Sequence, residues 1–381
     1  MPSLINPSSQ KFFLALSLSL KSPQLNPKKL MGNLRFENLL WEENLESWVY
    51  SLKKLLGIDA SQETLEKNLE VFEQERRRIE NEFKAPYQIQ CFFDSHYPNS
   101  LRSLRYPPFF IHLLGSASLL AKPMVSIIGT RQPTLLGQIE AKKMVALARS
   151  KEQVVVSGFA KGIDRCAHEE SIRLKAPTLA ILPGGFKFIY PKSNLTLIPR
   201  LIESGGLLLS EYPPQQQAYR SHFALRNRLI ACLGSKVIIL EAQKRSGTQI
   251  TARYAIELGK EIWIPRVEEP PLLFQEGLLE IKTLFPNTSE YAHPLEVFQK
   301  MASPENSSGK LDPETRCDVD LTPLESKLYE VLYYRPLSLE SLLSQFSQDS
   351  PLALRSALRK LTLLGILEKH PGPLFSSRPL A

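Results

Sequence analysis

The chain has 381 residues, of which 43% are hydrophobic and 23% are charged. This composition is typical of a soluble globular protein with two or three domains and excludes a chain that is mainly disordered. The formal net charge of +8 indicates an anionic partner. Residues 122–266 hold 22 Lys and Arg against 10 Asp and Glu, whereas the rest of the chain carries a net charge of −4. The basic excess therefore belongs to one segment.

The cysteines and the apolar runs indicate in which cellular compartment the protein acts. The four cysteines, at positions 91, 166, 232 and 317, are too scattered for a zinc-ligand spacing or a dense disulfide framework. They favour the reducing cytoplasm. No apolar run approaches the ~18 residues that a membrane span needs, and the stretch 12–20, which serines interrupt, is interpreted as a buried helix. We expect no membrane association, no metal and no cofactor.

The pattern of the chain divides it into five parts. Residues 1–85 show apolar positions at helical spacing and are predicted to form a small helical domain. Residues 86–121, with the run Tyr106-Pro107-Pro108, are predicted to be an irregular connector that packs on the core. A domain at 122–266 follows, then an extension and polar linker at 267–320, then a last domain at 321–381.

The segment 122–266 alternates short β-rich runs with amphipathic stretches, which predicts an α/β fold with a doubly wound parallel sheet. Strands are expected at 125–128, 154–157, 178–182, 207–211, 236–241 and 261–265. Helices are expected at 137–149, 163–174, 195–203, 223–232 and 248–258. Right-handed crossovers would then place every loop from a strand to the next helix at the same edge of the sheet.

The last 61 residues carry three helical stripes of leucines, in 324–332, 339–346 and 354–364. A run from Gly365 to Phe375 that can close as a hairpin follows them. Three short helices and a hairpin predict a winged helix-turn-helix domain. Its third helix carries Arg355, Arg359 and Lys360, so duplex DNA and a protein are both open as its partner.

Glycine-rich turns follow four of the predicted strands, at 129–131, 157–164, 183–185 and 246–248. Backbone N–H groups and helix N-termini at one sheet edge, beside Arg131, Lys161, Lys244 and Arg245, would form a cradle for phosphate. Glycine also simply allows a tight turn, and for any single turn this second interpretation is the better one. Neither a dinucleotide fingerprint nor a Walker A motif is present.

The densest basic cluster lies at 219–228, where Phe223 stands among Arg220, Arg226 and Arg228. Arginines can follow phosphates while an aromatic ring stacks on a base, which suits single-stranded nucleic acid. Alternatively, the arginines pair with Glu211 and Glu241 to hold the fold, with Phe223 in the core. Both interpretations stay open for Arg226 and Arg228, whereas the binding role is favoured for Arg220.

Candidates for catalysis are few. Asp164 and His168 lie four residues apart on a predicted helix, so they could act as an acid/base pair. More commonly, an aspartate in the first turn interacts with the helix dipole and such a histidine is packed in the core. Neither a Ser-His-Asp nor a metal-binding arrangement can be assigned among the six histidines.

Residues 97–266 resemble the DNA-processing protein A (DprA, also called Smf) family of single-strand DNA-binding recombination mediators. The resemblance is carried by VSIIGTR (125–131), VSGFAKGIDRCAH (156–168), IYPKSN (189–194), LSEYPP (209–214), FALRNRLIA (223–231) and SGTQITAR (246–253). It implies an extended Rossmann-like domain that dimerises, binds single-stranded DNA in a basic pocket and helps to load the RecA recombinase, as in natural transformation. It implies no catalysis.

By motif position the resemblance places Arg131, Lys192, Arg220 and Phe223 in the DNA pocket, with Phe223 as the group that stacks on a base. Together with the turns and the basic cluster, the expected nucleic-acid-binding residues are Gly129, Thr130, Arg131, Gly158, Lys161, Gly162, Lys192, Asn194, Arg220, Phe223, Arg226, Asn227, Arg228, Lys244, Ser246 and Gly247.

Two alternatives belong to other functional classes. A nucleotide-binding Rossmann hydrolase, similar to the lysine-decarboxylase-like phosphoribohydrolases, would use Glu211 or Asp164 as its catalytic carboxylate. The Pro183-Gly184-Gly185 turn lacks the Gly-Thr and glutamate that this pattern needs. A regulator that binds duplex DNA through residues 321–381 is disfavoured, since the charge excess lies in the central domain.

Overall fold

The computed structural model of the protein describes residues 62–244, 246–267, 275–291, 322–334, 337–363, 367–369 and 374–377. The predicted N-terminal helical domain lies outside these residues except for its last helix, α5 (Gln62–Phe83). Most of the predicted linker before residue 322 also lies outside them.

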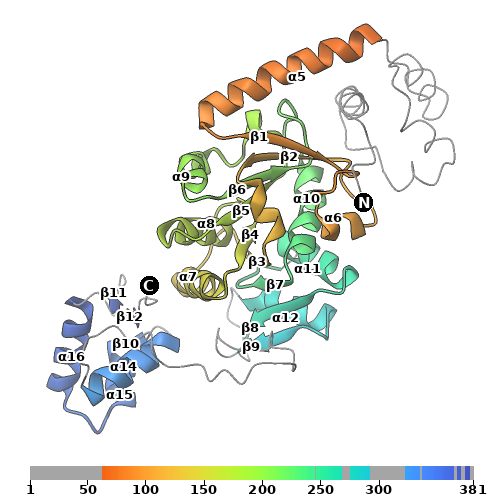
Figure 1. Cartoon of the computed structure of the whole chain (residues 1–381). Helices are drawn as coiled ribbons and strands as arrows, with labels where there is room; N and C mark the ends of the chain where they lie inside the picture. Colours follow the sequence, from red (N-terminus) through yellow and green to blue (C-terminus); the bar gives the residue numbers. More distant parts are fainter. Residues whose placement is uncertain are drawn as a thin grey trace, which may run out of the picture.

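A mixed α/β unit forms the centre of the described chain (Figure 1). Its nine strands lie in one sheet, among the described residues, in the order β1-β2-β6-β5-β4-β3-β7-β8-β9. The parallel part contains β3 (Met124–Ile128), β4 (Val154–Ser157), β5 (Thr178–Leu182), β6 (Leu207–Ser210), β7 (Lys236–Ile239) and β8 (Glu261–Pro265). All six predicted strands are confirmed.

The five predicted helices are confirmed as well. They are α7 (Leu135–Ser150), α8 (Ile163–Arg173), α9 (Leu197–Glu203), α10 (Arg220–Leu233) and α11 (Gly247–Glu257). Strands β3 and β7 pair parallel with each other in the sheet, and the strand order reverses between them. In open α/β sheets, ligands bind at such a switch point, outside the carboxyl ends of the strands.

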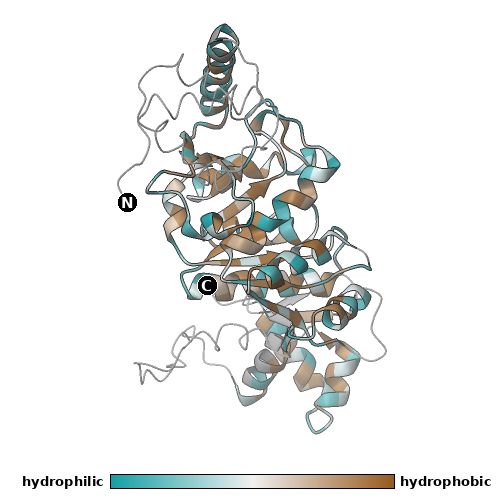
Figure 2. Cartoon of the chain, turned by 90° about the vertical axis from the view of Figure 1, so that its right-hand side faces the viewer, coloured by the Kyte–Doolittle hydropathy of each residue, from teal (hydrophilic) through white to brown (hydrophobic). Residues whose placement is uncertain are grey.

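Helices cover both faces of this sheet because the side chains of each strand alternate between them. In β3, Val125 and Ile127 belong to the apolar cluster that includes residues of α7 and α8. Met124 and Ile128 belong to the larger cluster with residues of α10 and α11. Figure 2 accordingly shows hydrophobic strands inside and hydrophilic residues on the outer faces of the helices.

The segment 86–121 differs from the predicted irregular connector because it adds two strands to the sheet. Strand β1 (Tyr87–Cys91) pairs antiparallel with β2 (Phe110–Gly115), and β2 pairs antiparallel with β6. Short helices α6 (Asn99–Ser103) and η1 (Ala117–Ala121) flank β2. All six residues of β2 are buried, so its apolar run shows no alternation. A short run of this kind after two prolines does not reveal a strand by periodicity.

The sheet also continues beyond the predicted boundary at residue 266. Helix α12 (Glu276–Leu284) leads to strand β9 (Ser289–Tyr291), which pairs parallel with β8. The first part of the predicted extension therefore belongs to the α/β unit. Strand β9 has only three residues, two of them partly exposed, so the sequence carries little strand signal there.

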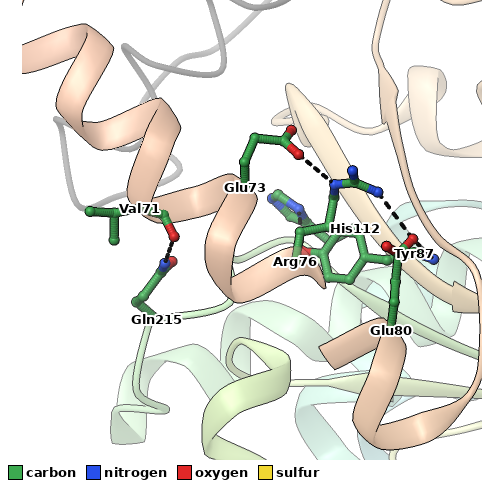
Figure 3. A network of polar contacts seen from close by, with 7 residues as sticks. All are labelled: Val71, Glu73, Arg76, Glu80, Tyr87, His112 and Gln215. Atoms are coloured by element: carbon green, nitrogen blue, oxygen red, sulfur yellow. Dashed lines mark hydrogen bonds and ion pairs between the residues drawn. The ribbon is translucent and has the colours of Figure 1, made fainter. Parts of the chain in front are cut away.

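Helix α5 packs beside β1 through the last two thirds of its length. Phe72 is fully buried, and its ring lies 6.1 Å from that of Tyr87. Figure 3 shows the polar contacts around this packing: Arg76 lies between Glu73 and Glu80, at 2.9 and 3.0 Å, and the Gln215 side chain donates to the Val71 carbonyl at 3.3 Å. The helix is thus attached to the sheet edge.

The residues described after position 321 form a second unit of three helices and three strands. These are α14 (Pro323–Tyr334), β10 (Leu337–Ser338), α15 (Leu339–Gln345), α16 (Pro351–Leu363), β11 (Leu367–Lys369) and β12 (Leu374–Ser377). The strands pair antiparallel in the order β10-β12-β11. The three leucine stripes meet in a separate core that includes Leu328, Leu342 and Leu358. None of the described helices is long and apolar enough to cross a membrane.

Candidate nucleic-acid interface

A groove of about 1710 Å³ lies at the carboxyl ends of the parallel strands. It is bordered by the turn after β3, the segment after β4 with Ala160 and Asp164, the segment 186–195, the first half of α10, the start of α11 and the last part of α5. All of these except α5 lie at the carboxyl ends of the parallel strands, around the point where the strand order reverses. Helix α5 comes from a part of the chain far away in sequence.

Basic and aromatic side chains meet in this groove. Arg131, Lys192 and Arg220 are exposed along its walls, and Phe223, which is half-buried, also borders it. The guanidinium carbon of Arg131 lies 5.8 Å from the centre of the Phe223 ring, which is a cation–π distance. The four residues that the family resemblance selected therefore lie in one groove, although they come from three separate segments.

Helical periodicity explains which residues of α10 face the groove. Arg220, Phe223 and Asn227 lie at positions i, i+3 and i+7 and form one stripe along the helix. The Asn227 amide also donates to the Gly247 carbonyl at 3.2 Å, so it ties α10 to the start of α11. Ser246, just before α11, and Gly247, its first residue, border the groove, as predicted.

Two of the predicted arginines are buried and hold the fold. Arg226 is 5% exposed at the groove floor and donates to the carbonyls of Gly158 and Ile181. Burial lowers the pKa of this guanidinium to about 10, while the Asp164 carboxylate opposes the shift. Arg228 points away from the groove and pairs with Glu211. For Arg228 the structural interpretation is therefore the better one.

Asn194 is also structural in this conformation. Its side chain is fully buried, and its amide donates to the carbonyls of Phe159 and Ala160 at 3.0 and 3.1 Å. Its amide oxygen accepts from Arg165 at 3.1 Å. Asn194 consequently fixes the loop after β4 against the segment after β5 rather than facing the groove.

The predicted glycines have different surroundings. Gly129 and Thr130 border the groove, whereas Gly158 and Gly162 do not. Gly162 has a φ of +79°, and a Cβ there would collide with the backbone of Thr130 and Arg131. This glycine therefore lets the loop after β4 approach the loop after β3, which places Arg131.

The remaining two predicted residues are lysines outside the groove. Lys161 is exposed on the loop after β4, and Lys244 makes an ion pair with Glu276 at 3.3 Å. Arg245, which the sequence placed beside them, lies outside the described residues.

Asp164 and His168 each have hydrogen-bond partners within the protein. The Asp164 carboxylate accepts from the backbone N–H groups of Gly158 and Ala160 at 3.1 and 3.3 Å. Burial raises the pKa of Asp164, and Arg226 opposes this shift. His168 is fully buried 2.9 Å from the Thr178 hydroxyl, and burial lowers its pKa to about 3. Asp164 borders the groove, whereas His168 does not.

The two glutamates at the ends of β6 and β7 also have structural partners. Glu211 holds Arg228, and burial raises its pKa while Arg228 opposes the shift. Glu241 accepts from the backbone N–H of Thr134 at 2.9 Å, just before α7 begins. Within the described ranges, no three His, Cys, Asp or Glu side chains gather as metal ligands.

The sequence interpretation missed several groove residues. Lys187, Phe188 and Tyr190 border the groove after β5. The run Phe186-Lys-Phe-Ile-Tyr-Pro-Lys192 interleaves aromatic and basic residues, so the signal used for 219–228 could have found it. Glu75 of α5 pairs with Lys187 at 2.7 Å, a contact between residues more than a hundred positions apart that only folding reveals.

Comparison with known proteins agrees with this geometry. The family model of DNA recombination-mediator protein A matches residues 88–281. The chain is 36% identical over 189 residues to the DNA processing protein DprA of Bacillus subtilis, covering 48% of this chain and 63% of that protein. It is 29% identical over 323 residues to the protein Smf of Synechocystis, covering 75% of this chain and 79% of that protein.

Two solved structures are similar as well. DNA processing protein A from Streptococcus pneumoniae superposes with a TM-score of 0.60 and 26% identity, over 76% of this chain and 97% of that chain. The corresponding protein from Helicobacter pylori, described for its single-stranded DNA binding mode, gives a TM-score of 0.51 and 26% identity, over 57% of this chain and 97% of that chain. The matched region, the groove and its motifs together show that this chain belongs to the DNA recombination-mediator protein A (DprA/Smf) family.

Proposed function

We propose that this protein binds single-stranded DNA in the groove, protects it, and helps to load RecA onto it, as in natural transformation. The observation that carries the proposal is the meeting of Arg131, Lys192, Arg220 and Phe223 at the strand switch point. Basic groups can neutralise phosphates while an aromatic ring stacks on a base, and neither contact needs a particular sequence. Binding is therefore expected to depend strongly on salt and weakly on sequence.

The relatives support the same proposal. The similar protein from H. pylori is described as binding single-stranded DNA, and the curated relatives are named as DNA processing proteins. We further propose that the protein forms a homodimer, is not an enzyme and acts in the cytoplasm. Glu211 does not border the groove and is paired with Arg228, and Asp164, which does border it, is only 6% exposed and accepts from two backbone N–H groups. Both arrangements weigh against the hydrolase alternative, because a catalytic carboxylate must be able to reach its substrate.

We also propose that the second unit is a winged helix. Its described order of helix, strand, helix, helix, strand and strand, with β11 and β12 as the hairpin, supports this assignment. Lys360 of α16 pairs with the buried Glu325 at 2.9 Å, and Arg355 and Arg359 are the exposed arginines of that helix.

The deciding experiment is fluorescence anisotropy of labelled oligo-dT and of a matching duplex across a salt series. With about four phosphates neutralised, the logarithm of the affinity for the single strand should fall against the logarithm of salt with a slope of roughly −3. The double variant Arg131→Ala/Phe223→Ala should lose at least roughly tenfold in affinity for the single strand.

Arg149→Ala serves as the matched control, because Arg149 is exposed at the end of α7 and outside the groove. It should bind as the wild type does. A slope near zero, or equal binding by the double variant, would contradict the proposal.

Release of free base from a panel of nucleotides would instead support the hydrolase. Faster RecA filament formation on the single strand tests the loading step.

A further inference from the structure

Tyr190 is the most exposed aromatic side chain among the described residues that border the groove. Tyr190 is 49% exposed, against 37% for Phe188, and Phe223 is half-buried. The rings of Tyr190 and Phe223 lie 5.7 Å apart, and their planes are turned by 89°. The groove thus holds two neighbouring aromatic rings at right angles.

The backbone around Tyr190 is firmly held. Ile189 before it is buried in the main core, and Pro191 after it is buried too. The backbone N–H of Asn194 donates to the Pro191 carbonyl at 3.0 Å, and Asn194 itself is anchored to the loop after β4. An exposed ring on a fixed backbone loses little conformational freedom when a ligand stacks on it.

Charges that suit a nucleic acid backbone flank this ring. Lys192 lies two residues after Tyr190 and Lys187 three residues before it, and both are exposed at the groove. Lys187 is paired with Glu75 of α5, whereas no ion pair joins Lys192 to an acidic side chain among the described residues. A phosphate beside Lys192 would bring an adjoining base within reach of Tyr190.

We propose that Tyr190 is a second stacking surface in the groove and that it takes one unpaired base next to the base on Phe223. This inference rests on the proposed binding of single-stranded DNA. Because the two rings are perpendicular, two bases stacked on them cannot stay stacked on each other. A flexible single strand can adopt this arrangement, whereas a duplex must keep its neighbouring bases stacked. The pair of rings therefore selects single strands over duplexes.

The test compares Tyr190→Leu with Tyr190→Phe on oligo-dT and on an abasic strand with the same number of phosphates. Stacking of one base is worth roughly 1–3 kcal/mol, so Tyr190→Leu should bind oligo-dT about 5- to 150-fold more weakly. Tyr190→Phe, which keeps the ring, should recover most of this loss. On the abasic strand, Tyr190→Leu and the wild type should bind alike, because no base is present to stack.

Tyr190 could instead act only by holding the Phe223 ring in place. A double-mutant cycle with Phe223→Leu distinguishes that role from stacking on a base of its own. If each ring takes its own base, Tyr190→Leu should still weaken binding in the Phe223→Leu background. No loss in that background, or an equal loss on the abasic strand, would overturn the inference while leaving single-strand binding intact. If the wild type itself shows no salt-sensitive binding of oligo-dT, the proposed function fails instead.

Discussion

At the scale of single residues, burial separates arginines that are close in the sequence. Arg220 is exposed at the groove, Arg226 forms its floor, and Arg228 lies in the protein interior against Glu211. All three stand within nine positions of one helix, so charge counting treats them alike. Their environments give them different roles: the first is available to a phosphate, and the third offsets a buried carboxylate.

These environments predict opposite phenotypes for two alanine variants. Arg228→Ala should lower the free energy of unfolding by roughly 3–5 kcal/mol, because it leaves the Glu211 carboxylate buried without its partner. Arg220→Ala should change it by less than about 0.5 kcal/mol but weaken binding of oligo-dT. Urea unfolding and anisotropy on both variants measure the two effects.

The double variant Arg228→Met/Glu211→Leu is the control for the buried pair, since it removes both charges. It should recover much of the stability that Arg228→Ala loses. Equal stability of Arg228→Ala and Arg220→Ala would show that the Arg228–Glu211 pair does not hold the fold.

At the scale of elements, helix α5 connects the sheet edge to the groove. Under it, the Tyr87 hydroxyl and the His112 ring nitrogen Nδ1 lie 2.9 Å apart (Figure 3). The Phe72 ring packs against both of their rings. The ring of Phe186, which borders the groove, lies 5.4 Å from that of Tyr87. One aromatic cluster therefore joins α5, the first two strands and the groove wall.

Burial of His112 predicts how stability depends on pH. Its pKa is lowered from 6.5 to about 3 by burial, so between these values the unfolded chain binds a proton that the folded chain does not. Stability is therefore lost as the pH falls from 6.5 towards 3, by about 1.4 kcal/mol per pH unit for this residue. His112→Leu/Tyr87→Phe should remove this contribution between pH 6 and pH 4.

Tyr87→Phe alone is the matched control, because it keeps the histidine and should keep the full slope. Urea unfolding at pH 6, 5 and 4 gives the slope of each variant. His168, whose pKa is also lowered to about 3, contributes equally to both variants and cancels in the comparison. Parallel slopes for the two variants would show that His112 takes up a proton in the folded protein.

At the scale of the whole molecule, the described chain has separate cores. The sheet unit is held by two apolar clusters on its two faces, and the residues after 321 have a cluster of their own. Every residue that borders the groove lies between Glu75 and Thr251. The groove is thus complete without the second unit.

A chain that ends after Tyr291 should consequently keep its affinity for oligo-dT within about threefold of the full chain, at most about 0.7 kcal/mol. Anisotropy at one salt concentration measures this directly. Loss of single-strand binding would mean that the second unit contributes to the site. Duplex binding by the full chain that the shortened chain lacks would support the regulator alternative for residues 321–381.

The sequence by itself determined the elements whose patterns are local. Six strands and five helices of the α/β unit follow from apolar runs and helical stripes. The helix expected at 223–232 left Arg220 outside, so the stripe of Arg220, Phe223 and Asn227 follows only from the observed start of α10 at Arg220. Motif resemblance added Lys192 to the groove. Strands β1, β2 and β9 were not found. Strand β2 is fully buried and β9 has three residues, so neither shows periodicity, and the burial along β1 does not alternate either.

Tertiary structure alone decided which of these residues meet and which are buried. Arg228 is inside because α10 turns that side of the helix towards Glu211, and Asn194 is inside because two loops close over it. Tyr190 faces Phe223, and Glu75 of α5 meets Lys187, across segments that are distant in the chain. Local sequence sets the hydrogen bonding and spacing within an element, whereas burial and pairing depend on the packing of separate elements against each other.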